Sequence, residues 1–175
     1  MSLDEERYPR IIGVNYESFV DGRGVRAAIF LSGCSHHCPG CHNPDSHDPE
    51  AGNVVTDETL EEILCQIDKR KRFLDGITLT GGDPLYCPAK TLNLVRVLTT
   101  DERWQYDYNI WLYTGYTLEQ IEENRKHNKA LDELMGFVDV LVDGRFVKEL
   151  ANKQLAFRGS SNQRIIRLNK GRKAE

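Results

Sequence analysis

Along the chain, short apolar runs typical of strands alternate with segments in which apolar residues have the spacing of a helix. Residues 25–31 form a short, largely apolar run that predicts a buried strand. A different pattern follows Thr56 and Asp57, either of which can cap a helix. Four apolar residues recur there at the spacing of one helical face: Leu60, Ile63, Leu64 and Ile67. The first half of the chain therefore predicts a strand followed by an amphipathic helix.

The same reading extends over the second half of the chain. It predicts strands over 77–80, 108–113 and 137–142, and helices over about 89–98 and 118–128. Strands that alternate with helices indicate an α/β fold with a parallel sheet, either open or curled into part of a barrel. A complete eight-unit barrel takes about 250 residues. We therefore expect an incomplete, TIM-like βα barrel in a single domain that spans residues 1–175.

Composition and charge narrow the function classes. The chain has neither an apolar leader nor a run long enough to cross a membrane, so we expect a soluble, cytoplasmic protein. A formal net charge of −4 gives no general attraction to phosphate backbones, which argues against nucleic-acid binding. The basic cluster in the C-terminal tail, residues 169–175, is expected to be solvated.

The cysteines carry the strongest chemical signal. A cytosolic protein keeps its thiols reduced, so five cysteines point to metal or redox chemistry rather than to disulfides. Cys34, Cys38 and Cys41 have the spacing C-x3-C-x2-C directly after the first predicted strand. Three thiolates on one tight loop can each bind one corner of an iron–sulfur cube and leave the fourth iron open. Gly40 removes a side chain where the cluster or its ligand must approach.

Two other readings of this loop remain open. A zinc site is possible because cysteine and histidine are zinc ligands and four histidines lie nearby, although structural zinc sites usually bring two spaced ligand pairs. The nearby histidines are His36, His37, His42 and His47, and we expect His36, His37 and His47 to be exposed loop residues. A redox-active Cys38–Cys41 pair is the second reading, but it leaves Cys34 unexplained.

A second motif, Gly81-Gly82-Asp83-Pro84, ends the next predicted strand. Paired glycines let the backbone approach a bound molecule closely. The motif alone would equally make an ordinary strand-to-helix turn. Its position favours a ligand, because ligands of parallel α/β folds gather at the carboxyl ends of the strands, where the cysteine loop also begins.

These motifs together make the sequence resemble the radical S-adenosylmethionine (SAM) superfamily. The wording SGCSHHCPGCHNP is similar to that of the activating enzymes of anaerobic (class III) ribonucleotide reductase. Five further segments agree with the resemblance: VDGRGVRAAIFLSGC at 20–34, TLTGGDPL at 78–85, IWLYTGYTLEQI at 110–121, DVLVDGRFV at 139–147 and RGSSNQRII at 158–166. They extend over most of the chain, from about residue 12 to residue 168.

The resemblance implies a [4Fe-4S] cluster on Cys34, Cys38 and Cys41, with SAM on the open iron. It also implies that Gly81 and Gly82 contact the amino end of SAM, and that Gly40, Cys41 and His42 lie beside the same cofactor. Gly40 stands where many relatives have an aromatic residue, so His42 or the backbone would face the adenine instead. The reduced cluster would cleave SAM and give a 5′-deoxyadenosyl radical. Side-chain acid–base catalysis is not required.

The implied partner is the large catalytic subunit of anaerobic ribonucleotide reductase, whose glycine would receive the radical. A one-electron donor such as flavodoxin would reduce the cluster. Three alternatives remain at this point: an activase of another glycyl-radical enzyme, a radical SAM enzyme with a small-molecule substrate, and a non-catalytic zinc-binding module. Cys65 lies off the apolar stripe of its helix, and Cys87 as a fourth thiolate would block the open iron, so neither is expected to be a ligand.

Overall fold

The computed structural model describes residues 7–103 and 108–168, so the basic tail at 169–175 lies outside the described residues. Its elements follow the chain in this order: β1 (Ile11–Ser18), β2 (Arg26–Leu31), the short 3₁₀ helix η1 (Pro44–His47), α2 (Asp57–Lys69), β3 (Gly76–Gly81), α3 (Pro88–Thr100), β4 (Asn109–Tyr113), α4 (Leu118–Arg125), α5 (Lys129–Phe137), β5 (Val140–Asp143), the 3₁₀ helix η2 (Lys148–Leu150) and β6 (Arg164–Arg167). Among the described residues, no helix combines the length and apolar character needed to cross a membrane.

The strands form one mixed sheet in which spatial order follows chain order, from β1 to β6. Strands β2, β3, β4 and β5 are parallel, as the alternation of strands and helices predicts. The edge strands β1 and β6 run antiparallel to their neighbours. The α/β class is therefore confirmed, and the sheet is mixed rather than purely parallel.

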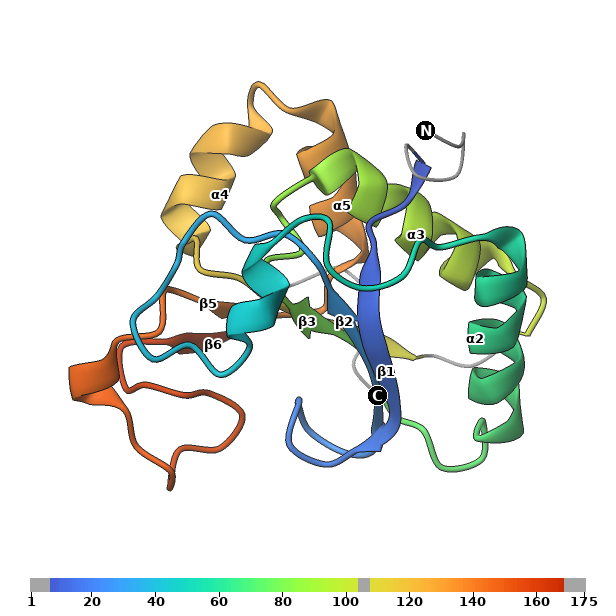
Figure 1. Cartoon of the computed structure of the whole chain (residues 1–175), viewed down its shortest axis with the longest axis horizontal. Coiled ribbons are helices and arrows are strands. Elements are labelled where there is room, and N and C mark those ends of the chain that lie inside the picture. The colour runs from blue at the N-terminus through green and yellow to red at the C-terminus, as the bar shows by residue number, and fades with distance from the viewer. Residues whose placement is uncertain (1–6, 104–107, 169–175) are drawn as a thin grey trace.

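One face of the sheet carries the main hydrophobic core. Alternate strand residues such as Ile29, Leu79 and Leu112 point to this face and are fully buried there. Buried residues of α2, α3, α4 and α5 pack against them, so all four helices cover the same face (Figure 1). The packed sheet and helices therefore hold the carboxyl ends of the parallel strands, and the loops that follow them, in fixed positions.

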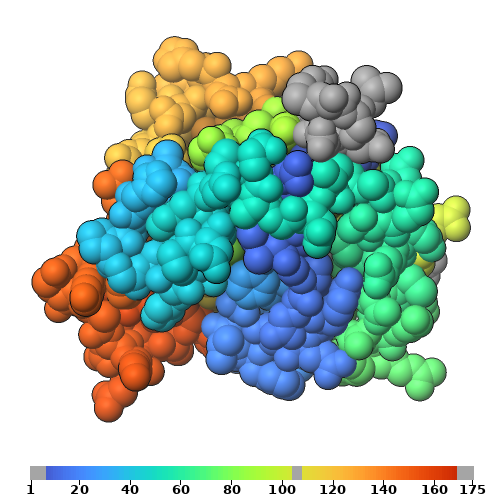
Figure 2. Space-filling model, viewed as in Figure 1, coloured from blue at the N-terminus to red at the C-terminus, as the bar shows by residue number. Residues whose placement is uncertain are grey.

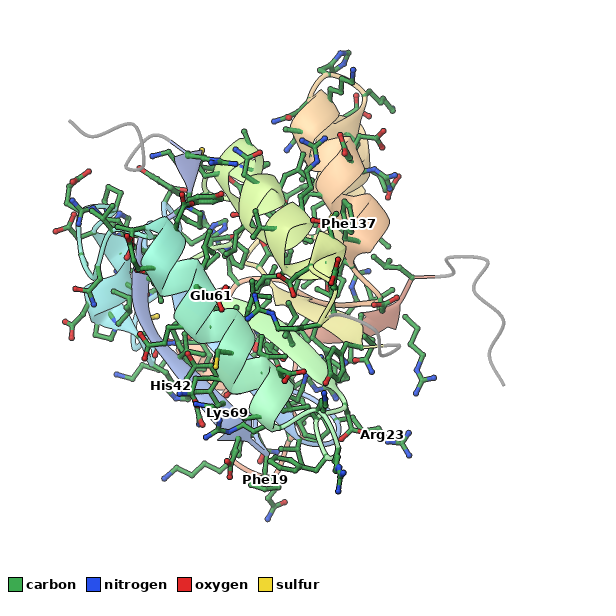
Figure 3. All side chains as sticks on the ribbon, turned by 90° about the vertical axis from the view of Figure 1, so that its right-hand side faces the viewer. Phe19, Arg23, His42, Glu61, Lys69 and Phe137 are labelled. Carbon is green, nitrogen blue, oxygen red and sulfur yellow. The ribbon has the colours of Figure 1, made fainter. Side chains whose placement is uncertain are left out.

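Helix α2 matches its prediction closely. Thr56 caps it, and Thr56 and Thr59 form a reciprocal capping box. The four predicted apolar residues of this helix are buried, whereas Glu61 and Lys69 lie on its outer face (Figure 3). Local capping and helical periodicity therefore agree with the tertiary packing.

The region after Asn128 is where the prediction was wrong. The strand predicted over 137–142 begins only at Val140, and Phe137 ends a separate helix, α5. The Asn128 side chain accepts a hydrogen bond from the N–H of Leu131 and so starts α5 instead of ending α4. Buried Leu131 and Leu134 anchor this helix to the core. Strands β1 and β6 were also missed, since each depends on a partner strand more than on its own pattern.

The second face of the sheet has a polar centre. Arg26, at the start of β2, is fully buried there and donates hydrogen bonds to the Thr78 hydroxyl at 2.6 Å, to the Asn109 side chain and to the Ile77 and Asn109 carbonyls. Its guanidinium lies 5.3 Å from the centre of the Trp111 ring. Burial lowers the pKa of Arg26 to about 10. Arg26 thus ties the amino-terminal ends of β2, β3 and β4 together.

We expect Arg26→Ala to lower the free energy of unfolding by about 3 kcal/mol, because it leaves several buried acceptors without a donor. Chemical denaturation monitored by circular dichroism measures this change. Arg23→Ala is the matched control, since the exposed Arg23 side chain points away from the body (Figure 3), and it should change stability by less than about 0.5 kcal/mol. Equal stability of the two variants would contradict a structural role for Arg26.

Candidate functional site

The candidate site lies where the carboxyl ends of four parallel strands meet. The cysteine loop follows β2, Gly82-Asp83 follows β3, Thr114-Gly115 follows β4 and Gly144-Arg145 follows β5. Residues far apart in sequence are therefore brought to one edge of the sheet, which is where ligands of such sheets bind.

The cysteine loop is shaped by its contacts with η1. Gly33 N–H donates to the Ser46 carbonyl at 2.9 Å, and Cys34 N–H donates to the His47 carbonyl at 3.2 Å. Gly33 has a φ of +92°, and a Cβ there would lie 2.4 Å from the Tyr86 ring. Only glycine satisfies both conditions. The loop consequently leaves β2 in a fixed direction.

The three predicted ligands share this loop. Cys34, Cys38 and Cys41 are free thiols of intermediate exposure. Cys41 N–H donates to the Cys38 carbonyl at 3.1 Å, and Asn43 N–H lies 3.4 Å from the Cys41 sulfur as its donor. Burial raises the pKa of the Cys34 thiol, while N–H groups of His36 and His37 directed at it act in the opposite sense. Backbone N–H groups thus already face two of the sulfurs, as bound thiolates require.

The three cysteines of the loop lie in different surroundings from Cys65 and Cys87. An open hollow of about 680 Å³ adjoins Cys34 and is also lined by His37 and Tyr86. Cys65 lies within α2, and Cys87 precedes α3 beside a different cavity of about 250 Å³. Among the described residues, no three His, Cys, Asp or Glu side chains converge on a single-ion site.

The paired glycines bring the end of β3 against the cysteine loop. Gly81 has a φ of +95°, and a Cβ there would lie 2.6 Å from the Leu31 nitrogen. A Cβ on Gly82 would lie 2.5 Å from the Gly33 carbonyl oxygen and 2.8 Å from that of Ser46. These distances show that both glycines make room for backbone. The sequence analysis considered the approach of a ligand or an ordinary strand-to-helix turn, and it did not foresee this contact between backbone segments.

The Asp83 carboxylate, which the sequence analysis did not single out, is the centre of the site. It is 3% exposed and accepts hydrogen bonds from the Thr114 hydroxyl at 2.9 Å, from Gly115 N–H at 3.0 Å and from Leu85 N–H at 2.8 Å. The His36 Nε2 atom lies 2.7 Å from Asp83 Oδ2. An acidic residue at the carboxyl end of a predicted strand was the available signal for this role.

His36 joins this carboxylate to the last parallel strand. Its Nδ1 atom accepts a hydrogen bond from Arg145 Nε at 3.1 Å, so Nε2 carries the proton donated to Asp83. The ring packs edge-on against Tyr116 at 4.6 Å between centroids, and its side chain is only 6% exposed. The expectation that His36 is an exposed loop residue was therefore wrong, because residues from the loops after β3, β4 and β5 surround it. His37 is exposed as expected.

The remaining predicted residues lie at the outer side of the cysteine loop. Gly40 is exposed with a φ of +75°, and His42 is exposed with its ring centroid 5.6 Å from that of Phe146. The His47 Nε2 atom is buried and has no hydrogen-bond partner within residues 7–103 and 108–168. His47 is therefore partly buried rather than exposed, and it also lines the hollow beside Cys34.

Comparison with known sequences agrees with this geometry. The sequence model of a family described as a 4Fe-4S single cluster domain matches residues 20–166, which contain the whole cysteine loop. An iron–sulfur cluster, rather than zinc, is thus the metal group of this family.

Curated relatives cover most of the chain. The anaerobic ribonucleoside-triphosphate reductase-activating protein of Vibrio cholerae is 34% identical over 159 residues, which is 88% of this chain and 98% of that protein. The protein of the same name from Enterobacteria phage T4 is 36% identical over 84% of this chain and 86% of its own length. That of Escherichia coli K12 is 32% identical over 89% and 99%. The chain belongs to the family of anaerobic ribonucleoside-triphosphate reductase-activating proteins.

Proposed function

We propose that this chain is a radical SAM activase that generates the glycyl radical of anaerobic ribonucleotide reductase. The observation that carries the proposal is the cysteine loop, which presents three free thiols at the carboxyl ends of the parallel strands in a chain of this family. The open mixed sheet, with helices on one face, supports the incomplete TIM-like barrel that the resemblance implies. A single radical SAM domain over about 12–168 is part of the same proposal.

Cys34, Cys38 and Cys41 would hold the [4Fe-4S] cluster. The donor set fits, since three cysteines share one loop and N–H groups face the sulfurs of Cys34 and Cys41. When bound, the cluster supplies the electron that cleaves the sulfonium bond of SAM and so provides the hydrogen-abstracting radical. The share of the protein is to hold the loop in place and to keep water out.

SAM would lie between the cysteine loop and the end of β3. Gly40, Cys41 and His42 would contact SAM from the loop, and Gly81 and Gly82 would contact it from the strand. The exposure of Gly40 and His42 leaves both accessible to a ligand. Gly81 also accepts a 3.4 Å hydrogen bond from the Asn43 side chain, which draws the two sides together. The backbone contacts of Gly81 and Gly82 position the cysteine loop, and SAM would bind to polar backbone groups that these contacts leave free.

The partner would be the large catalytic subunit of the reductase. A glycine Cα–H is a suitable target, because the product radical is delocalised over two amide groups. A one-electron donor such as flavodoxin would supply the reducing equivalent in a cytoplasmic setting.

Replacing Cys34, Cys38 or Cys41 by alanine should abolish the visible absorbance of the anaerobically reconstituted protein and its cleavage of SAM. Each variant removes one of the three proposed thiolate ligands. Cys65→Ala is the control and should keep both properties, since Cys65 lies within α2. Equal loss in Cys65→Ala would show that the ligand set is wrong.

Gly82→Val should lose the cluster together with SAM cleavage. The added side chain would meet the Gly33 and Ser46 carbonyl oxygens at less than 3 Å, so the cysteine loop itself must move. Iron content and visible absorbance of the purified variant measure the loss. Gly136→Ala is the control, because a Cβ there meets nothing within 4 Å. A Gly82→Val protein with full cluster content and weak SAM binding would instead favour a direct ligand contact.

Reduced, SAM-loaded protein mixed anaerobically with the large reductase subunit should give 5′-deoxyadenosine, methionine and the doublet electron-paramagnetic-resonance signal of a glycyl radical. Changing the acceptor glycine of the subunit to alanine should remove that signal. A radical formed only on a different glycyl-radical enzyme, such as a formate-lyase type, would leave the chemistry standing and make the substrate assignment wrong.

A further inference from the structure

The connection between β5 and β6, residues 144–163, lies beside the cysteine loop. Figure 1 shows this connection, coloured orange, extending from the strand ends past the light-blue and cyan loop. In the space-filling view of Figure 2 the same two segments touch along one flank of the molecule. The connection contains RGSSNQ at 158–163, a motif that the proposed chemistry leaves without a role.

Three side chains of the connection contact the loop. Arg145 donates to His36, as described above. A Cβ added to Gly40 would lie 3.6 Å from the Phe146 ring and 3.4 Å from the Lys148 side chain, so both lie beside Gly40. On its other side the Phe146 ring would be 3.0 Å from a Cβ on Gly159. Phe146 is thus held between the cysteine loop and the RGSSNQ motif.

The Gln163 side chain links the two ends of the β5–β6 connection. Its Oε1 atom accepts hydrogen bonds from the N–H groups of Gly159 at 2.9 Å and Ser160 at 3.1 Å, and its Nε2 donates to the Gly144 carbonyl at 3.0 Å. One side chain therefore joins the first residue of the connection to its last turn. The fixed ends remove most of the freedom that a segment of this length would otherwise have.

The rest of the motif acts in the same way. Arg158 donates to the Gln163 carbonyl at 2.7 Å, and the Asn162 side chain donates to the Arg145 carbonyl at 2.8 Å. Ser160 is fully buried, and its hydroxyl accepts a hydrogen bond from Val147 N–H at 3.2 Å. These polar groups hydrogen-bond within the connection and so hold it in one conformation.

We infer that Gln163 is a positioning residue for the cluster. It fixes the β5–β6 connection so that Phe146 packs beside Gly40 and His42 while Arg145 holds His36, and these contacts restrain the backbone that carries Cys38 and Cys41. The inference rests on the proposed function for the presence of the cluster, but the geometry of these contacts concerns this chain alone. Without Gln163 the connection opens locally while the core remains folded.

The first test measures the reaction of Cys38 and Cys41 with a thiol reagent in the full chain without cluster, followed by peptide mass spectrometry. Gln163→Ala should react faster at both cysteines by on the order of tenfold, because three hydrogen bonds that oppose opening are lost. Phe146→Ala should show a similar increase, and Phe146→Leu should restore part of the protection. Ser161→Ala is the control, since Ser161 is exposed and should react like the unchanged chain.

The second test uses the reconstituted protein. A chelator should bleach the cluster of Gln163→Ala several-fold faster than that of Ser161→Ala. If no form of the chain takes up a cluster while Gln163→Ala still exposes Cys38 and Cys41, the proposed function fails and the positioning role stands. Unchanged thiol reactivity in folded Gln163→Ala and Phe146→Ala proteins would overturn the inference.

Discussion

The buried carboxylate of Asp83 is the constraint on which the site depends. Removing a carboxylate from water costs several kcal/mol unless hydrogen bonds replace its solvation. Its described partners are the Thr114 hydroxyl, the Gly115 and Leu85 N–H groups and His36. These partners come from the ends of β2, β3 and β4, and His36 extends the set to Arg145 after β5. Displacement of any one loop would remove part of the hydrogen bonding that offsets the burial of this carboxylate, so the loops favour one arrangement.

Close contacts of the backbone make this arrangement possible. Gly33, Gly81 and Gly82 allow the cysteine loop, η1 and the end of β3 to approach to distances that a side chain would prevent. On the outer side, the β5–β6 connection places Phe146 beside Gly40 and His42. The cysteine loop is therefore fixed from beneath by Asp83 and His36 and from outside by Phe146. A redox cluster bound there would be held by a loop that has little freedom to rearrange.

The two faces of the sheet stabilise the strands in different ways. The helical face supplies the apolar packing that stabilises the strands. The opposite face carries Arg26 at the amino-terminal ends of the strands, far along them from the cysteine loop. Its hydrogen bonds fix the spacing of β2, β3 and β4 at that end, and Asp83 fixes it at the other. The parallel strands are thus joined by polar groups at both ends.

Some features could be predicted from the sequence because their signals are spacings between residues close together in the chain. These features are the three-cysteine loop, the capped and periodic helix α2 and the central strands. The antiparallel edges β1 and β6, the separate helix α5, the burial of His36 and the roles of Asp83 and Gln163 could not be predicted. The edge strands, His36 and Asp83 depend on partners far along the chain, up to the 109 residues between His36 and Arg145. Helix α5 has a local cap at Asn128, but the burial of Leu131 and Leu134 anchors it to the core. Such contacts follow from the fold, because burial and hydrogen bonding stabilise groups that are close in space and not in the chain.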